Sequence, residues 1–278
     1  MKLVTYDSQG IQSVGILEGE WVYPTGYGSL LELIRAQKPA QKIGQALAKG
    51  QVQILAPIPH PQQDIICLGV NYMAHAQESA RFKKEDFNGE RPYAVYFSKR
   101  VDCALEDGGT IPSYPGLVDS LDYEVELAAI IGRDAKAVRQ EDAWEYVFGY
   151  TILNDVSARN VQNRHKQWYF GKSMDGFCPM GPCVVTREEF AFPPALEIYS
   201  RVNGELRQQA NTRDMIFDLP FVIAELSQSM TLRAGTVIAT GTPAGAGMGF
   251  TPPKWLRPGD LVECGIEGIG VLRNRVGG

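Results

Sequence analysis

Short runs of alternating polar and apolar residues dominate this chain, which indicates many strands and few helices. Successive side chains of a strand point to opposite faces, so alternation marks a strand with one buried face. Such runs, together with short continuous apolar runs, predict strands at residues 65–69, 94–98, 124–131, 147–154, 183–186, 197–202, 236–240, 261–266 and 270–275. In the same part of the chain, the clearest helical pattern is that of residues 219–228.

Residues 1–60 read as a small N-terminal module. Predicted strands at 3–6, 11–17 and 21–23 precede Ser29 and Glu32, whose spacing is that of a capping box and predicts a helix from Leu30. A second helix is predicted at 41–48. Alternating prolines within 56–61 forbid helix and favour an extended connection. We therefore place a domain boundary near residue 60, with a larger domain at 61–278.

The order of the predicted elements bears on the fold class. Strands and helices do not alternate regularly, which argues against a doubly wound fold, and the chain contains no internal repeat. Asn203-Gly204 supplies the dipeptide that a two-residue hairpin turn requires. The sequence therefore predicts a strand-dominated α+β protein built on a mixed sheet or β-roll.

Composition narrows the class of partner. The apolar fraction of 44%, the charged fraction of 21% and the net charge of −5 are ordinary for a globular protein, and no dense Lys/Arg block suggests nucleic acid or an anionic membrane as a partner. No apolar run approaches the roughly 20 residues that span a bilayer, and the N-terminus lacks a signal-peptide core. Five cysteines without a Cys-x-x-Cys pair indicate neither a disulfide framework nor a zinc site. We expect a cytoplasmic protein with reduced thiols.

Three acidic residues stand beside apolar runs. Glu124 and Glu126 share one face of a predicted strand, roughly 7 Å apart. Two carboxylates that enter a hydrophobic core repel each other and lose solvation, and a divalent cation between them would remove both penalties. Asp155 ends another apolar run. The pattern predicts a three-carboxylate site for Mg²⁺ or Mn²⁺, with a metal-free structural acid cluster as the alternative.

The three histidines differ in their surroundings. His60 lies among prolines and His165 in a polar stretch, so both fit exposed turns or loops. If a helix begins near Tyr72, His75 and Glu78 are i, i+3 neighbours on one face. A carboxylate that accepts from one ring nitrogen leaves the other nitrogen free to take a proton from water. A His-x-x-Glu pair taken alone does not establish catalysis.

Polar residues after Asp155 fit a substrate carboxylate. With Asp155 as N-cap of a helix, Arg159 and Gln162 fall at i+4 and i+7 along one stripe. A guanidinium and an amide beside a metal suit a carboxylate-bearing substrate. The alternative is a helix N-terminus with an exposed polar face.

Two lysines have two interpretations each. Lys172 lies between aromatic residues and glycines, where an ammonium held partly out of water would stabilise a developing oxyanion. It could equally be a loop lysine whose stem covers aromatic rings. Lys99, which follows Tyr96-Phe97-Ser98, allows the same two interpretations; we predict that it contacts substrate.

The glycine-rich stretch 239–249 follows a predicted strand. No Gly-Lys-Ser/Thr closes it, and Pro252-Pro253 prevents a helix from starting, so a nucleotide-binding loop is rejected. The stretch instead predicts a tight loop that brings the hydroxyl and amide of Thr242 toward a ligand.

Taken together, the motifs resemble the fumarylacetoacetate hydrolase family over about residues 60–275. The matching pieces occur in family order: Gly69-Val70-Asn71-Tyr72 with His75 and Glu78, Asp122-Tyr123-Glu124-Val125-Glu126-Leu127, Asn154-Asp155-Val156-Ser157-Ala158-Arg159, Gly171-Lys172-Ser173-Met174-Asp175 with Pro179 and Gly181-Pro182, and Thr240-Gly241-Thr242-Pro243-Ala244-Gly245. No single piece is decisive, whereas the ordered set is specific.

The resemblance implies a β-roll or β-sandwich catalytic domain after a small N-terminal module, in a homodimer. Residues 79–91 stand in the place of the family's mobile lid, and a further aspartate ligand of the eukaryotic founding enzyme has no counterpart that we can place. The implied roles are metal binding by Glu124, Glu126 and Asp155, water activation by His75 and Glu78 on a short helix that orders with substrate, oxyanion stabilisation by Lys172, and substrate binding by Arg159, Gln162 and Thr242.

The predicted activity is metal-dependent hydrolysis of a carbon–carbon bond in an acylpyruvate or other 2,4-dioxo acid. His75 would deprotonate water, hydroxide would attack the 4-carbonyl, Lys172 would stabilise the oxyanion, and pyruvate enolate would depart. The same enolate serves decarboxylation of oxaloacetate-like acids and keto–enol or double-bond isomerisation, and the dyad favours hydrolysis or decarboxylation over simple tautomerisation. A non-catalytic, metal-bound sensor of small acids is the alternative of another class.

Overall fold

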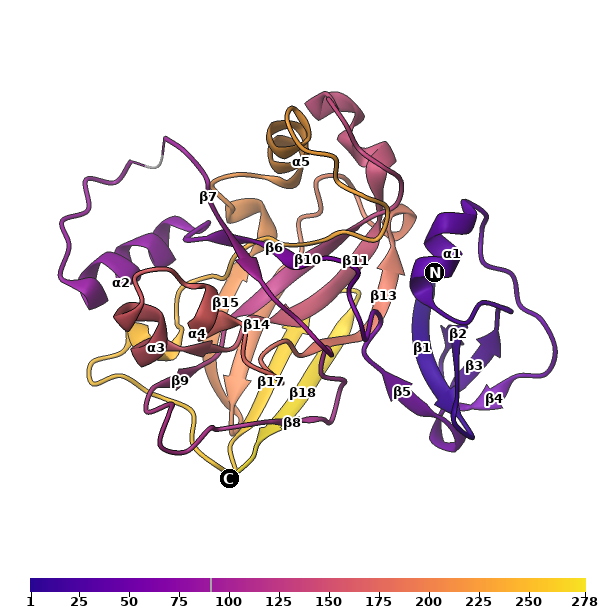
Figure 1. Ribbon diagram of the computed structural model, residues 1–278, viewed down its shortest axis with the longest axis horizontal. Helices are drawn as coiled ribbons and strands as arrows, with labels where there is room; N and C mark the ends of the chain where they lie inside the picture. Colours follow the sequence, from indigo (N-terminus) through magenta and orange to yellow (C-terminus); the bar gives the residue numbers. More distant parts are fainter. Residues whose placement is uncertain (91) are drawn as a thin grey trace.

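The computed structural model describes residues 1–90 and 92–278, so the last residue of the predicted lid lies outside the described residues. A sheet of 11 strands and a sheet of five strands form the body (Figure 1). The large sheet has the order β4-β3-β2-β1-β13-β11-β10-β16-β6-β7, with β5 paired to β1. Its strands are β1 (Lys2–Ser8), β2 (Ile11–Glu18), β3 (Trp21–Pro24), β4 (Leu47–Ala48), β5 (Gln53–Leu55), β6 (Ile65–Gly69), β7 (Val95–Lys99), β10 (Val125–Ile131), β11 (Val147–Asn154), β13 (Met180–Thr186) and β16 (Val237–Ala239).

The second sheet has the order β15-β14-β17-β18-β8, and β9 pairs with β12 in a short ribbon. These strands are β8 (Thr110–Ile111), β9 (Leu121–Asp122), β12 (Ser157–Ala158), β14 (Glu197–Val202), β15 (Glu205–Asn211), β17 (Leu261–Ile266) and β18 (Gly270–Val276). The pairs β16–β6 and β18–β8 are parallel and the remaining pairs of the named strands are antiparallel. The mixed, strand-dominated architecture predicted from the sequence is confirmed.

The described helices are short: α1 (Leu30–Ala36), α2 (Met73–Lys83), α3 (Arg159–Arg164), α4 (Tyr169–Lys172) and α5 (Leu219–Ser227), with 3₁₀ turns η1 (Lys49–Gln51), η2 (Gln140–Tyr146), η3 (Arg187–Glu189), η4 (Thr212–Asp214) and η5 (Gly247–Gly249). Helices α1 and α5 begin where the sequence predicts. The Ser29 hydroxyl accepts a hydrogen bond from the Glu32 amide at 3.1 Å, while the Glu32 carboxylate accepts from the Gly28 amide instead of closing the capping box on Ser29. Among the described residues, no helix has the length and apolar character needed to cross a membrane.

Strand β10 is buried on both faces, which explains its continuous apolar run. Leu127, Ala129 and Ile131 share a hydrophobic cluster with residues of β14, β17 and β18. Ala128 and Ile130 belong to a second cluster on the opposite face, with residues of β6 and β16. The acidic residues at the start of β10 are therefore carried by one of the most deeply packed strands of the protein.

The N-terminal strands continue the large sheet. Strand β1 pairs with β13 through Lys2↔Val185 and Leu3↔Val184, so hydrogen bonding passes without a break from this segment into the rest of the protein (Figure 1). The domain boundary near residue 60 stays a prediction.

The predicted helix at 41–48 is wrong. Gly44 adopts φ +64°, the Ile43 amide donates to the Pro24 carbonyl at 2.8 Å, and Leu47–Ala48 form β4 against β3. A short isolated helix is only marginally stable, so pairing with an existing strand decides the conformation.

The predicted N-cap role of Asp155 is also wrong. Ser157 and Ala158 pair with Asp122 and Leu121 as β12–β9, and α3 begins only at Arg159. The residues after Asp155 form hydrogen bonds with a segment that is distant in the sequence. The short strand β12 therefore lies between Asp155 and the start of α3.

Candidate active site

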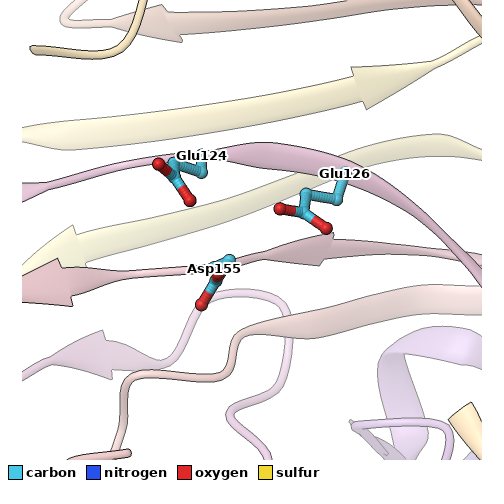
Figure 2. A group of neighbouring side chains, drawn as sticks. All are labelled: Glu124, Glu126 and Asp155. Atoms are coloured by element: carbon cyan, nitrogen blue, oxygen red, sulfur yellow. The ribbon is translucent and has the colours of Figure 1, made fainter. Parts of the chain in front are cut away.

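Three carboxylates meet at the junction of β10 and β11. Glu124 directly precedes β10, Glu126 lies within it, and Asp155 directly follows β11. One carboxylate oxygen from each lies within 4.8 Å of the others, and all three residues are buried (Figure 2). The predicted clustering of these side chains is therefore present.

Strand register explains the convergence. Val125 pairs with Asn154 in the antiparallel β10–β11 ladder, which places the residue before one strand beside the residue after the other. The Asp155 amide donates to the Glu124 carbonyl at 2.8 Å, and the Glu124 amide donates to Asn154 Oδ1 at 3.0 Å. Backbone and side-chain hydrogen bonds thus hold Glu124 and Asp155 together.

Three buried cations neutralise part of this acidic cluster. Lys172 Nζ donates to Asp155 Oδ2 at 2.6 Å and to Glu124 Oε2, and Lys99 Nζ donates to Asp155 Oδ1 at 2.8 Å. Arg159 donates through Nη2 to Glu124 Oε1 and through Nε to Asp122 Oδ2 at 2.8 Å. Burial of opposite charges at this density requires that nearly every charged atom has a partner.

The carboxylates differ in how much neighbouring positive charge offsets the cost of burying them. Burial alone would raise the pKa of Glu124, but the charges of Arg159 and Lys172 outweigh it and lower that pKa below its usual range. Burial and the negative charges of Asp155 and Glu124 raise the pKa of Glu126 well above its usual range. Glu126 accepts from the Gly241 amide at 2.8 Å and pairs with no lysine or arginine among the described residues.

The donor set fits a hard divalent cation. Carboxylate oxygens are the ligands that Mg²⁺ and Mn²⁺ prefer, and the three side chains each offer one oxygen to a common point. Glu126, buried and short of positive charge, is the group that such a cation would relieve. The burial and geometry of this cluster therefore support a metal site.

His75 and Glu78 lie on one face of α2, as predicted, with Tyr72 as N-cap of the helix. His75 Nδ1 is 3.4 Å from Glu78 Oε2, and His75 Nε2 is 3.9 Å from Glu124 Oε1. One ring nitrogen thus faces the orienting carboxylate while the other faces the acidic cluster. His60 and His165 are exposed, and neither lines this cavity.

The glycine-rich loop after β16 anchors the carboxylates of the site. The Gly241 amide donates to Glu126, the Gly245 amide to Glu78 at 2.9 Å, and the Gly247 amide to Asp122 at 2.7 Å. A loop that presents several of its amides to carboxylates needs little side-chain bulk. These contacts come in addition to the predicted role of the loop, in which Thr242 is presented to a ligand; Thr242 does line the cavity.

Gly245→Ala tests this anchoring. Gly245 has φ +102°, and a Cβ there would lie 1.9 Å from the Arg207 carbonyl oxygen, so the loop must move and withdraw its amide from Glu78. If His75 and Glu78 form the predicted proton-transfer pair, we expect turnover to fall by at least about tenfold, together with a lower Tm. Gly259→Ala is the matched control, because φ is +92° but nothing lies within 4 Å of the added Cβ. Equal turnover loss in both variants would contradict the anchoring role.

A cavity of about 30 Å³ opens between α2, the acidic cluster and the loop before α4. That is room for one or two water molecules. Predicted site residues on its wall are His75, Glu124, Glu126, Arg159, Gln162, Lys172 and Thr242. Binding of an organic acid therefore requires side chains or α2 to shift outward.

Three predicted substrate ligands are engaged with the protein itself. Thr242 Oγ1 donates to the Val125 carbonyl at 2.9 Å and accepts from Gln208, and Gln162 Oε1 accepts from Arg159 Nη1 at 3.0 Å. Lys99 is not on the cavity wall: it is 0% exposed and reaches Asp155 and the carbonyls of Val156 and Lys172. Substrate contact by these residues stays a prediction.

Sequence reasoning assigned no role to Asp122 or Trp168. Asp122 is fully buried and links Arg159 to the amides of Gly247 and Met248. The Trp168 ring lines the cavity and lies 5.1 Å from the Phe97 ring. The sequence did contain one indication of a role for Asp122: it lies two residues before Glu124, in the same acidic motif.

Fold and site together define a class of strand-dominated, two-sheet proteins that carry a three-carboxylate centre faced by a His–Glu pair. The family model described as fumarylacetoacetate (FAA) hydrolase C-terminal matches residues 64–277. This chain belongs to the fumarylacetoacetate hydrolase family, whose members are enzymes. The predicted family and fold class are confirmed.

Relatives within the family have diverse names. Oxaloacetate tautomerase YisK of Bacillus subtilis (strain 168) is 45% identical over 243 residues, which are 87% of this chain and 79% of the relative. The solved structure of fumarylacetoacetate hydrolase from Exiguobacterium antarcticum has a TM-score of 0.88 at 39% identity, covering 100% of this chain and 99% of that one. A 2-hydroxyhepta-2,4-diene-1,7-dioate isomerase from Mycobacterium marinum has a TM-score of 0.79 at 30% identity, covering 100% and 98%.

Proposed function

We propose that this chain is a metal-dependent tautomerase of small 2-oxo dicarboxylic acids such as oxaloacetate. One observation carries the proposal: the imidazole of His75 faces the acidic cluster across a cavity lined by Arg159 and Lys172. The His75–Glu78 pair by itself favours hydrolysis or decarboxylation, so the choice of tautomerisation rests on the comparison with named relatives. The name of the 45% identical relative, oxaloacetate tautomerase, supports a 2-oxo diacid as the substrate.

Glu124, Glu126 and Asp155 would hold Mg²⁺ or Mn²⁺. Such a cation supplies a Lewis acid that stabilises the negative charge of an enolate. The three carboxylates are held together without an ion, because the β10–β11 register aligns the two strand ends and the Gly241 amide binds Glu126. That preorganisation lowers the cost of assembling the centre.

His75 would move the proton. Ketonisation of an enol requires one proton to leave the C2 hydroxyl and one to be added at C3, and a neutral imidazole can hold and release a proton at Nε2. Glu78 orients the ring through Nδ1, and the Gly245 amide in turn fixes Glu78. This chain of contacts directs Nε2 toward the cavity.

Arg159 and Lys172 would bind the 2-oxo carboxylate end of the substrate. The Arg159 guanidinium and the Lys172 ammonium both line the cavity, and each forms an ion pair with Glu124. A substrate oxyanion could share their hydrogen bonds without removing them from the core. Lys99, behind Asp155, would act by holding that carboxylate in position rather than by touching substrate.

Carbon–carbon hydrolysis of an acylpyruvate is the second candidate, with decarboxylation of oxaloacetate as a further outcome. The specific observation in its favour is the His75–Glu78 pair, which could take a proton from water as readily as from carbon. A solved structure of maleylpyruvate hydrolase from Sphingobium sp. SYK-6 has a TM-score of 0.76 at 29% identity to this chain.

Metal removal and a substrate panel test the proposal. We expect Mg²⁺ or Mn²⁺ to raise the Tm of EDTA-treated protein, because a ligand bound only to the folded state stabilises it, and we expect the loss of enol-oxaloacetate absorbance to accelerate only with the cation. Acetylpyruvate cleavage is followed as acetate release and decarboxylation as CO₂ release. Faster acetylpyruvate cleavage would establish the second candidate, and tight binding without turnover of any 2-oxo acid would indicate a sensor.

A further inference from the structure

We propose that Lys83 recognises the second carboxylate of a dicarboxylic substrate and so sets the substrate class of the site. The inference rests on the proposed function, because it deepens the assignment of a 2-oxo diacid. Lys83 is the last residue of α2 and lines the same cavity as the acidic cluster.

The other cations of the cavity are already committed to carboxylates or to polar partners. Arg159 donates through Nε to Asp122, through Nη1 to Gln162 and through Nη2 to Glu124. Lys172 bridges Glu124 and Asp155. These groups can neutralise one end of a substrate, but they leave no positive charge for a second carboxylate.

Lys83 has no such commitment. It is exposed, and among the described residues no carboxylate lies within ion-pair distance of its ammonium. Its Nζ lies 5.4 Å from the centroid of the Trp168 ring, a cation–π contact. An ammonium group that lies beside a cavity and has no carboxylate partner is available to an anionic ligand.

Trp168 gives Lys83 a fixed support. The indole packs against Gly69, where an added Cβ would lie 2.2 Å from Trp168 Cζ3, and edge-on against Phe97 at 5.1 Å between ring centroids. The glycine at the end of β6 thus leaves room for the ring. Lys83 rests over an aromatic surface that forms part of the cavity wall.

Helix α2 joins this recognition group to the proton-transfer group. His75, Ser79, Phe82 and Lys83 all line the cavity and follow the spacing i, i+4, i+7 and i+8, which is one face of a helix. The Lys83 ammonium lies against Trp168, on the same cavity wall as His75. A substrate bound at one end by Arg159 and Lys172 would present its other carboxylate to Lys83, and that contact would draw α2 and His75 over the reacting carbons.

Lys83→Met is the test, measured with oxaloacetate and with its 4-methyl ester on the Mg²⁺-loaded protein. A hydrogen bond between charged groups contributes enough that its loss should raise KM for oxaloacetate about tenfold or more, with kcat within about twofold. KM for the ester should be unchanged, since the ester lacks the second charge. Lys83→Arg should restore most of the discrimination. Arg81→Met, which removes a cation from the same helix away from the cavity, is the matched control and should change neither KM.

Binding without turnover separates this inference from the proposed function. Malate and lactate differ by the second carboxylate, and calorimetry should show malate binding weakened about tenfold in Lys83→Met with lactate binding unaltered. That result would support the role of Lys83 even if no 2-oxo acid were turned over, in which case only the proposed function fails. Equal losses for malate and lactate, or for oxaloacetate and its ester, would overturn the inference.

Discussion

His75→Ala should lower kcat for enol-oxaloacetate by about 10²- to 10⁴-fold, the usual contribution of a positioned general acid–base group. The imidazole is the only titratable ring on the described cavity wall, with Nε2 3.9 Å from Glu124 and Nδ1 3.4 Å from Glu78. The variant should still bind Mg²⁺, because none of the three clustered carboxylates is altered. Steady-state kinetics and the Mg²⁺-dependent rise in Tm are the measurements.

Two further variants serve as comparisons for the loss of kcat in His75→Ala. Glu78→Gln keeps a hydrogen-bonding partner for the ring but removes the charge, so its effect should be smaller than that of His75→Ala. His165→Ala removes a histidine that lies outside the cavity and should leave kcat unchanged. Wild-type turnover by His75→Ala, with metal binding intact, would show that another group moves the proton.

Asp155→Asn should destabilise the protein by about 3–5 kcal/mol and abolish the stabilisation by Mg²⁺. Asp155 and Lys99 are both 0% exposed, and Asp155 is the only carboxylate that pairs with Lys99 among the described residues. The substitution therefore leaves a buried ammonium without a counter-charge, and it removes one of the three carboxylates that would hold the cation. Urea denaturation and metal-dependent Tm report the two effects separately.

A double-mutant cycle checks the cause. Asp155→Asn combined with Lys99→Met should be more stable than the sum of the single changes predicts, because the second change removes the orphaned charge. Asp134→Asn breaks an exposed ion pair with Arg233 and should cost no more than about 1 kcal/mol. Additive losses in the cycle would mean that the two buried groups do not stabilise each other.

The parts of the site that could be predicted depend on local periodicity. The two-residue repeat of a strand places Glu124 and Glu126 on one face, and the three-residue spacing in a helix places His75 beside Glu78. Both relations hold whatever the rest of the chain does. Long apolar runs likewise marked β10 and β11, because strands buried on both faces show little alternation.

The errors arose where a segment had a partner far away in the sequence. Residues 41–48 have helix-compatible composition but pair with β3, and the segment after Asp155 pairs with β9 before α3 begins. Hydrogen bonds to a distant strand outweighed a weak local preference in both cases. The glycine-rich loop could be identified as a loop, but not as the source of amides for Glu126, Glu78 and Asp122.

The amino-acid sequence by itself determined the strand-dominated class, the acidic pair on β10, the His–Glu pair on α2 and the family to which they belong. The sequence also predicted that Asp155 joins that pair, and the structure bears this out. Only the tertiary structure decided that Lys99 lies behind Asp155 and that Lys83 lies on the cavity wall against Trp168. The reason is that side-chain direction within one element follows from backbone geometry, whereas the neighbours of a buried charge depend on how distant strands align.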